Sequence, residues 1–392
     1  METKKKKWLV YMGVGIGVAL LLLLLLILSF WYRKSHEAKP PPVSPSASKM
    51  PKSTEPGSIP DLNTKSWSLS SHGLQYAVEY LTVYKLEDLQ IATDYFSQAN
   101  KIKGSVYRGS FKGDAAAVKI MKGDVSAEIN ILKMISHSNI IRLSGFCLHH
   151  GNTYLVYEYA ESGSLSDRLR NECQKAASLC LDWKQRVQIA YDVADALNYL
   201  HNYTNPPYIH KNLKSSNILL DANLRAKISN FGLARALEEE DSEGGLQLTR
   251  HVVGTQGYMP PEYIENGVIT PKLDVFAFGV VMLELLSGKE AAAGGDKNAG
   301  EELLCRSISL VLDGDNVREK LRGFMDPFLR DEYPFDLAFS MAQLAKTCVA
   351  HDLNARPSMP QVFMIMSKIL SSSLDWDPSN ELERSTTLSL SR

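Results

Sequence analysis

This 392-residue chain has few cysteines and almost no excess of charge of either sign. The formal net charge is -1, which gives no electrostatic reason to expect a nucleic-acid partner. The five cysteines are scattered and include no C-x-x-C pair, so they predict reduced thiols and exclude a disulfide framework or a zinc site. With 44% hydrophobic and 22% charged residues, the composition is globular and allows one large domain with additional segments.

The one long apolar run lies at the N-terminus, where residues 8–32 carry no charged side chain. A run of this length crosses a hydrocarbon core of about 30 Å. Trp8 at one end, with Trp31 and Tyr32 at the other, suits the aromatic belts of the two interfaces. We therefore predict a transmembrane helix over residues 8–32, after a short extracellular segment of residues 1–7. A cleaved signal peptide is the alternative, but the stretch is too long and lacks a small-residue cleavage site.

Composition divides the rest of the chain into three parts. Residues 33–75 are rich in Pro, Ser and Lys and predict an extended juxtamembrane linker. Residues 76–370 begin with β-like runs and turn mainly helical after Gly163, which predicts an α+β fold with a small sheet-rich lobe and a larger helical lobe. Residues 371–392 predict a loose polar tail. The patterns predict helices at 85–93, 126–135, 186–201, 275–286 and 354–370, and strands at 105–107, 115–120 and 153–157.

Two short motifs have the frame of protein-kinase signatures. Residues 210–217 read H-K-N-L-K-S-S-N, which matches the catalytic loop H-R-D-L-x-x-x-N except that Asn212 stands at the position of the catalytic base. Asn230-Phe231-Gly232 matches D-F-G, with an asparagine in place of the magnesium-binding aspartate. A neutral carboxamide cannot accept the proton of a substrate hydroxyl, and magnesium is usually held by carboxylates and phosphate. We therefore predict no functional catalytic residue, and only degenerate, weak metal ligands at Asn217 and Asn230.

The residues that would hold a nucleotide are partly retained. Lys119, in the sequence A-V-K, matches the strand lysine that contacts the α- and β-phosphates, and Glu128 matches the helix glutamate that pairs with it. The preceding glycine-rich loop keeps only Gly104, so its backbone is a poor cradle for phosphate. Tyr157 and Tyr159 complete the predicted cofactor-binding set. We expect ATP binding to be weak at most, without tightly bound Mg²⁺.

The structural residues of the kinase plan are present. Residues 257–262 read G-Y-M-P-P-E and match the end of an activation segment, whose Glu262 is expected to pair with Arg356. Asp274 is expected to brace the backbone of the catalytic loop. The other predicted structural residues are His210, Phe231 and Gly232. Because these positions persist while the catalytic carboxylates are replaced, the pattern favours retention of the fold over indiscriminate decay.

From about residue 84 onward, the chain resembles the plant receptor-like kinases and, more narrowly, the kinase-dead branch of the LysM receptor-like kinases. The resemblance is carried by residues 84–97 (YKLEDLQIATDYFS), 123–132 (GDVSAEINIL), 137–147 (HSNIIRLSGFC) and 373–378 (SLDWDP). Members of that branch are implied to bind chitin-type or lipochitooligosaccharide ligands through extracellular LysM modules and to signal through an active partner kinase. No LysM module precedes the predicted span here, so ligand recognition is not assigned to these residues.

The resemblance and the two asparagines together imply a single-pass plasma-membrane pseudokinase of Ser/Thr-kinase ancestry, with its kinase-like domain in the cytosol. It would serve as a scaffold or co-receptor for an active receptor-like kinase and for cytosolic signalling kinases, in chitin or lipochitooligosaccharide perception. The alternative is a weakly active ATP-dependent Ser/Thr kinase that uses Lys119 and Asn217 with an unorthodox metal. A third reading is a truncated product that does not signal.

Overall fold

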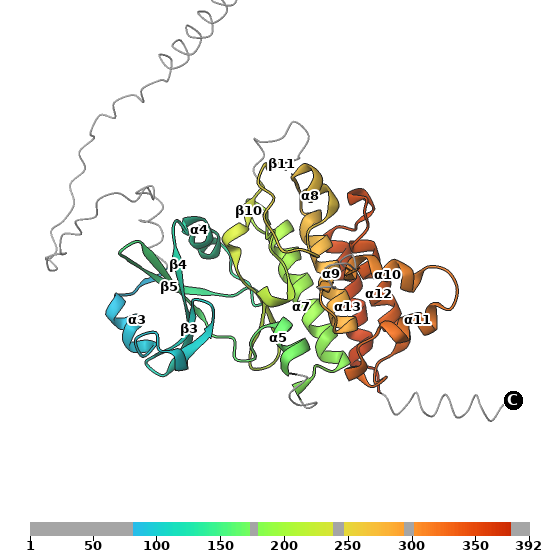
Figure 1. The fold of residues 1–392 in the computed structure, drawn as a ribbon, viewed down its shortest axis with the longest axis horizontal. Coiled ribbons are helices and arrows are strands. Elements are labelled where there is room, and N and C mark those ends of the chain that lie inside the picture. The colour runs from blue at the N-terminus through green and yellow to red at the C-terminus, as the bar shows by residue number, and fades with distance from the viewer. Residues whose placement is uncertain (1–80, 173–178, 238–246, 294–301, 378–392) are drawn as a thin grey trace, which may run out of the picture. The chain divides into compact units, whose positions relative to one another are not determined.

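The computed structural model describes residues 81–172, 179–237, 247–293 and 302–377 (Figure 1). The predicted extracellular segment, transmembrane helix and juxtamembrane linker lie outside the described residues, as does the tail after residue 377. Within the described ranges, no helix combines the length and the apolar character needed to cross a membrane. The described part has a small sheet-rich lobe followed in sequence by a larger helical lobe (Figure 1).

The small lobe is built on a six-stranded sheet with the strand order β1-β5-β6-β4-β3-β2. Its strands are β1 (Thr82–Val83), β2 (Lys101–Lys103), β3 (Val106–Phe111), β4 (Asp114–Lys122), β5 (Leu143–His149) and β6 (Asn152–Glu158). All neighbouring strands are antiparallel except β1, which runs parallel to β5. Helices α3 (Leu86–Ala92) and α4 (Ser126–Met134) complete the lobe and confirm the two helices predicted there.

Successive side chains of β4 point alternately to the two faces of the sheet. Val118 is fully buried and packs with Leu89 and Val156. Its neighbours Ala117 and Lys119 point to the opposite face, where both line the cleft described below. Because successive side chains of a strand alternate between faces, the buried Val118 fixes the direction of Lys119.

The larger lobe is mainly helical. Its helices are α5 (Leu165–Asp167), α7 (Trp183–Asn202), α8 (Pro261–Asn266), α9 (Lys272–Ser287), α10 (Leu304–Leu312), α11 (Val317–Phe324), α12 (Phe335–Cys348) and α13 (Met359–Leu374). Its two-residue and three-residue strands are β7 (Tyr208–Ile209), β8 (Ile218–Leu220), β9 (Ala226–Ile228), β10 (Arg235–Ala236), β11 (Gln247–Leu248), β12 (Val268–Ile269), β13 (Ala292–Ala293) and β14 (Glu302–Leu303). Short helical turns are η1 (Gln98–Asn100), η2 (Arg168–Glu172), η4 (Ser215–Asn217), η5 (Phe231–Leu233), η7 (Pro327–Leu329) and η8 (Leu353–Ala355).

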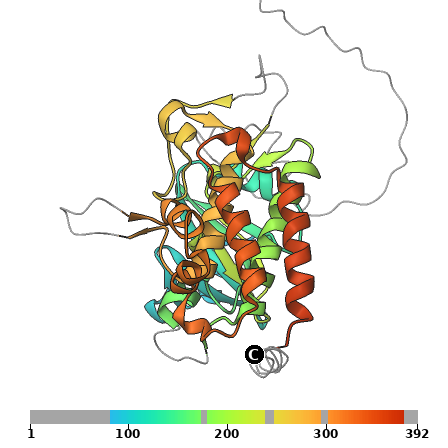
Figure 2. The same ribbon diagram turned by 90° about the vertical axis from the view of Figure 1, so that its right-hand side faces the viewer.

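Two long helices form the centre of this lobe. Helix α7 begins at a capping box in which the Asp182 side chain accepts from the Gln185 backbone and the Gln185 side chain accepts from the Asp182 backbone. Helix α9 is buried from Leu273 to Ser287, as its nearly all-apolar sequence predicts. Figure 2 shows the long helices of this lobe side by side, with α13 packed along α7.

The last helix differs from the prediction at both ends. The sequence pattern predicts its start at residue 354, but Ser358 caps it together with Gln361, and α13 begins at Met359. It continues to Leu374, past the predicted domain end at residue 370. The reason is a tertiary contact: Ser373 is fully buried, and its hydroxyl accepts a hydrogen bond of 3.0 Å from Trp183 Nε1 in α7. The predicted tail therefore begins later than residue 371.

The cysteines differ from the prediction at one position. Cys147, Cys305 and Cys348 are free thiols, and Cys173 lies outside the described residues. Cys180 is disulfide-bonded, so the prediction of reduced thiols is wrong there. The number and spacing of cysteines constrain a framework or a metal site, but they do not show whether one pair lies close together.

Candidate functional site

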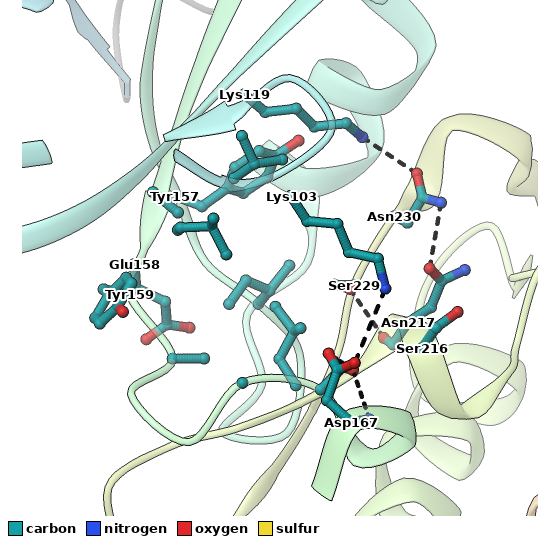
Figure 3. Close-up of a pocket in the computed structure, with 18 of the residues that line it drawn as sticks. Lys103, Lys119, Tyr157, Glu158, Tyr159, Asp167, Ser216, Asn217, Ser229 and Asn230 are labelled. Atoms are coloured by element: carbon teal, nitrogen blue, oxygen red, sulfur yellow. Dashed lines mark hydrogen bonds and ion pairs between the residues drawn. The ribbon is translucent and has the colours of Figure 1, made fainter. Parts of the chain in front are cut away.

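A cleft of about 350 Å³ is lined by residues of both lobes (Figure 3). The small lobe contributes residues of β2, β3, β4 and α4, and the larger lobe contributes the segments around β8 and η5. Six of the predicted site residues line it: Lys119, Glu128, Tyr157, Tyr159, Asn217 and Asn230. Gly104 and Asn212 are not among the lining residues. Gly104 lies between β2 and β3 with a φ of +55°, a conformation that glycine adopts without strain.

Lys119 and Glu128 form an ion pair in the cleft. Lys119 Nζ lies 3.9 Å from Glu128 Oε1, and the Tyr157 hydroxyl donates a hydrogen bond of 2.8 Å to the same oxygen. Glu128 is in the first turn of α4 with its side chain 1% exposed. Its other oxygen, Oε2, has no hydrogen-bond partner among the described residues. Burial, reinforced by the Glu128 carboxylate, raises the pKa of Tyr157 well above its ordinary value, so its hydroxyl remains a donor.

The three asparagines of the two motifs, Asn212, Asn217 and Asn230, are joined by hydrogen bonds. Asn230 Oδ1 accepts from Lys119 Nζ at 3.2 Å. Asn230 Nδ2 donates to Asn217 Oδ1 in a long contact of 3.5 Å (Figure 3). Asn217 Nδ2 in turn donates to the Asn212 backbone carbonyl at 2.8 Å. Both side-chain oxygens that could face a metal therefore already accept a hydrogen bond.

This arrangement fits a magnesium ion poorly. Mg²⁺ takes hard oxygen ligands in near-ideal octahedral geometry and is usually held by one or two carboxylates with substrate phosphates. Asn217 and Asn230 offer neutral carboxamides whose oxygens are engaged. The Lys119 ammonium group, 3.2 Å from Asn230 Oδ1, would also repel a cation at that oxygen. No reaction step is therefore assigned to a metal here.

Asp274 fixes the backbone of the segment that leads to Asn212. Its fully buried carboxylate accepts from the backbone N–H groups of His210 and Lys211, each at 2.8 Å. His201 Nε2 lies 2.9 Å from the same carboxylate. Burial opposes the charge of Asp274, but the hydrogen bond and the charge of His201 hold its pKa below the ordinary value. Asn212 is thus held in place on a rigid backbone, with an amide where the matched motif has a base.

His210 and Phe231 connect this loop to the Asn230-Phe231-Gly232 segment. The two rings pack edge to face with centroids 4.8 Å apart, and both side chains are fully buried. His210 Nε2 also lies 3.1 Å from the Ser229 carbonyl oxygen. Gly232 is close to the ion pair, because a Cβ added there would lie 3.3 Å from Glu128 Oε2.

Glu262 and Arg356 join the end of the activation segment to the C-terminal part of the lobe. Arg356 Nη1 donates to Glu262 Oε1 at 2.6 Å, and Arg356 Nη2 donates to Glu262 Oε2 at 2.7 Å. The Arg356 side chain is buried, so this bidentate pair is shielded from water. The structure therefore brings together the two residues that the sequence suggested as a pair.

The sequence reasoning missed the ion pair at the mouth of the cleft. Lys103 Nζ lies 4.0 Å from Asp167 Oδ1, and both residues line the cleft (Figure 3). Lys103 directly precedes Gly104, in the segment that lacks the other glycines of the glycine-rich loop. The sequence shows a lysine at this position. Whether its side chain meets Asp167 depends on where α5 lies, which the sequence does not show.

Sequence reasoning also missed a buried polar cluster around Glu284 of α9. The Glu284 carboxylate accepts from the Ser215 hydroxyl at 2.8 Å, from the Tyr258 hydroxyl at 2.7 Å and from Arg170 Nη2. Burial raises the pKa of Glu284, although these donors oppose that rise. The cluster ties together α9, the catalytic loop, the activation segment and η2.

Comparison with known proteins identifies the family. The protein kinase domain family matches residues 104–365. Protein LYK5 of Arabidopsis thaliana is 58% identical over 371 residues, which cover 92% of this chain and 55% of that protein. LysM domain receptor-like kinase 3 of Arabidopsis thaliana is 40% identical, covering 77% of this chain and 48% of that protein. Chitin elicitor receptor kinase 1 of Arabidopsis thaliana is 36% identical, covering 85% of this chain and 55% of that protein.

This chain spans about half the length of these curated relatives. The match to the kinase family and the two observed lobes confirm the predicted kinase-like fold. Kinase domains in general bind ATP with Mg²⁺, whereas the strength of binding here and the loss of activity stay predictions. The chain belongs to the protein kinase family and is a relative of the LysM receptor-like kinases.

Proposed function

We propose that this chain is a receptor-like pseudokinase that signals through partner binding and does not transfer phosphate. The observation that carries the proposal is the chain of amides in the cleft, in which Asn230 contacts Lys119 and Asn217 contacts Asn230. At Asn212, a carboxamide cannot take the proton of an attacking hydroxyl. A positioned base is worth about 10²–10⁴ in rate, and metal stabilisation of the developing charge is worth several kcal/mol more. Losing both leaves negligible turnover.

The parts of the structure that maintain the fold support a scaffold role. Asp274 retains its hydrogen bonds to the catalytic-loop backbone, and Arg356 retains its bidentate pair with Glu262. These contacts fix the catalytic-loop backbone and the end of the activation segment without contributing to chemistry. A partner kinase can therefore bind a well-ordered surface of this domain, although the domain itself is inactive.

The relatives suggest the biological setting. Their names include LysM domain receptor-like kinases and a chitin elicitor receptor kinase. We therefore place this chain at the plasma membrane as a single-pass protein, with residues 8–32 as the span and the kinase-like domain in the cytosol. It would act as a co-receptor for an active receptor kinase and for cytosolic signalling kinases, in chitin or lipochitooligosaccharide perception.

The test is phosphate incorporation by the full chain, purified in detergent, with ATP and either Mg²⁺ or Mn²⁺. We expect no incorporation above background from the native chain. The double variant Asn212→Asp plus Asn230→Asp is the gain-of-function control, because it restores the base and a metal-binding carboxylate. Incorporation by the native chain that Lys119→Ala abolishes would overturn the proposal.

A weakly active Ser/Thr kinase is the second candidate function. The ion pair of Lys119 with Glu128 favours it, as does the hydrogen bond of 2.8 Å from Lys214 Nζ to the Thr255 hydroxyl. This candidate expects incorporation that depends on Lys119, and a preference for a metal other than Mg²⁺. The same assay with the same variant separates the two functions.

A further inference from the structure

The sheet of the small lobe leaves part of one strand without a neighbour. Strand β2 pairs with β3 at Val106 and Tyr107. Beyond these two residues, the outer edge of β3 from Arg108 to Phe111 has no partner strand among the described residues. An unpaired edge presents backbone N–H and C=O groups to which another extended segment can bond.

The hydrogen-bond pattern between β3 and β4 shows which groups face this edge. Ile120 N–H donates to the Ser105 carbonyl at 2.9 Å, and bonded pairs alternate with non-bonded pairs in an antiparallel ladder. The odd-numbered residues of β3 are therefore bonded to β4, and the N–H and C=O of Ser110 point away from it. The two-residue turn Lys112-Gly113, with positive φ at both residues, agrees, since the residues that flank such a turn form a bonded pair.

A cavity of about 230 Å³ lies against this edge. It is lined by three consecutive residues of β3, from Arg108 to Ser110, and by small or polar residues of neighbouring segments that include Ala92 and Asn100. Its volume is below the roughly 300–1,000 Å³ of small-molecule pockets, and its lining contains no aromatic side chain. These properties suit the backbone and one side chain of an extended peptide better than an organic cofactor.

Arg108 is the charged residue of this cavity. No acidic side chain is among the described residues that line it. The exposed residues nearby balance one another in charge, because Lys101 and Lys112 stand against Asp94 and Asp114. The charge that an occupant meets inside the cavity is therefore the positive charge of Arg108.

The position of Arg108 favours a carboxylate as its partner. Its Cζ lies 5.2 Å from the centroid of the Tyr159 ring, a cation–π contact that limits the motion of the guanidinium. A guanidinium binds a carboxylate through two parallel hydrogen bonds. On a strand added beside β3, we therefore expect Asp or Glu at the position that faces Arg108.

A second copy of this chain is a poor occupant of the edge. If two β3 edges paired antiparallel about Ser110, Arg108 of one protomer would lie opposite Lys112 of its partner. Like charges directly opposite one another on neighbouring strands are destabilising. The charge pattern thus favours a different protein with an acidic segment.

We propose that the outer edge of β3, from Arg108 to Phe111, binds an extended acidic segment of a partner protein as an additional strand. Backbone hydrogen bonds to Ser110 supply affinity, and a carboxylate against Arg108 supplies selectivity. The inference rests on the proposed function, because a chain that signals by binding partners needs a surface of this kind.

The experiment uses the full chain in detergent and a fluorescent hexapeptide of alternating valine and glutamate. A hexapeptide of alternating valine and lysine is the matched probe of opposite charge. Fluorescence anisotropy should give a dissociation constant about tenfold lower for the glutamate peptide. Hydrogen exchange should locate the site, because the glutamate peptide should slow the exchange of backbone amides in residues 105–116.

Two substitutions separate the backbone contribution from the charge. Ser110→Pro removes the outward N–H but leaves the bonded positions of the ladder intact, and it should weaken binding roughly threefold to tenfold. Ser110→Ala is its matched control, since it keeps the N–H and should bind as the native chain does. Arg108→Glu should reverse the preference, so that the lysine peptide binds more tightly. Thermal unfolding curves check that each variant folds.

Equal binding of the two peptides by the native chain would overturn the inference, as would no binding of either. The same holds if Arg108→Glu leaves the preference unchanged, or if Ser110→Pro binds as tightly as Ser110→Ala. If Ser110→Pro does not fold, Arg108→Glu and the exchange pattern decide. Protection of residues 105–116 that rises with chain concentration in the absence of peptide would assign the edge to a second copy and overturn the acidic partner.

None of these outcomes affects the proposed function. That proposal fails if the native chain incorporates phosphate, which is a separate measurement.

Discussion

Replacing Asp274 with asparagine tests whether the fold depends on the hydrogen bonds that the Asp274 carboxylate accepts from the catalytic-loop backbone. The Asp274 carboxylate is fully buried and accepts from the backbone N–H groups of His210 and Lys211, both at 2.8 Å. His201 Nε2 lies 2.9 Å from it as well. A carboxamide of the same size turns an NH₂ group toward at least one of these donors. A buried N–H then loses its acceptor, and the pairing with His201 weakens.

We expect the free energy of unfolding to fall by about 3–5 kcal/mol, the range for removing one partner of a buried charge pair. Roughly 1–3 kcal/mol of this is the cost of each buried donor left unpaired. The measurement is urea unfolding of the full chain in detergent, read as a shift of the midpoint at constant slope.

Asp313→Asn is the matched control for this substitution. The Asp313 side chain is 64% exposed and pairs with Lys346 at the surface, so the same chemical change there should cost less than about 1 kcal/mol. If Asp274→Asn proved no more destabilising than Asp313→Asn, the argument that Asp274 holds the loop would be refuted.

Three further predictions follow from buried contacts. Arg356→Lys should cost about 2 kcal/mol in urea unfolding, because lysine cannot form the two parallel hydrogen bonds to Glu262; an unchanged midpoint would contradict this. Gly145→Ala should lower the thermal midpoint in calorimetry, because its methyl group would lie 2.1 Å from the Thr82 carbonyl oxygen, at an overpacking cost of about 1–3 kcal/mol. The pKa of Asp274 is below its ordinary value of 3.8, so its charge stabilises the fold above that value and this contribution is lost as pH falls through the folded pKa. Stability measured across the acid range should therefore fall less steeply below about pH 4 in Asp274→Asn than in the native chain.

The elements that the sequence predicted well have long and strong patterns. The apolar run at 275–286 and the amphipathic run at 186–201 correspond to α9 and α7, which are long enough to repeat their periodicity several times. The strands β7, β10, β11 and β12 each have two residues and carry no readable alternation. They form because the loops that contain them lie side by side, which is a tertiary effect.

The cleft was predictable in position and less so in its contacts. Motif spacing led to Lys119, Glu128, Asn217 and Asn230, and all four line one cavity. The Lys103 contact with Asp167 and the Glu284 cluster were not predicted, because each joins residues far apart in the sequence. Residue type and local spacing do not show how far a lysine side chain reaches or which donors surround a buried glutamate.

The buried position of Val118 restricts how the gene for this protein can change in length. Deleting or inserting one codon within β4, while its pairing with β3 and β6 is kept, would turn Lys119 into the apolar layer beside Leu89 and turn Val118 toward the cleft. Such a shift would bury an ammonium group and remove it from the cleft in a single step. We therefore expect length variation among natural sequences to fall in the turns that flank this strand, and changes inside it to come two residues at a time.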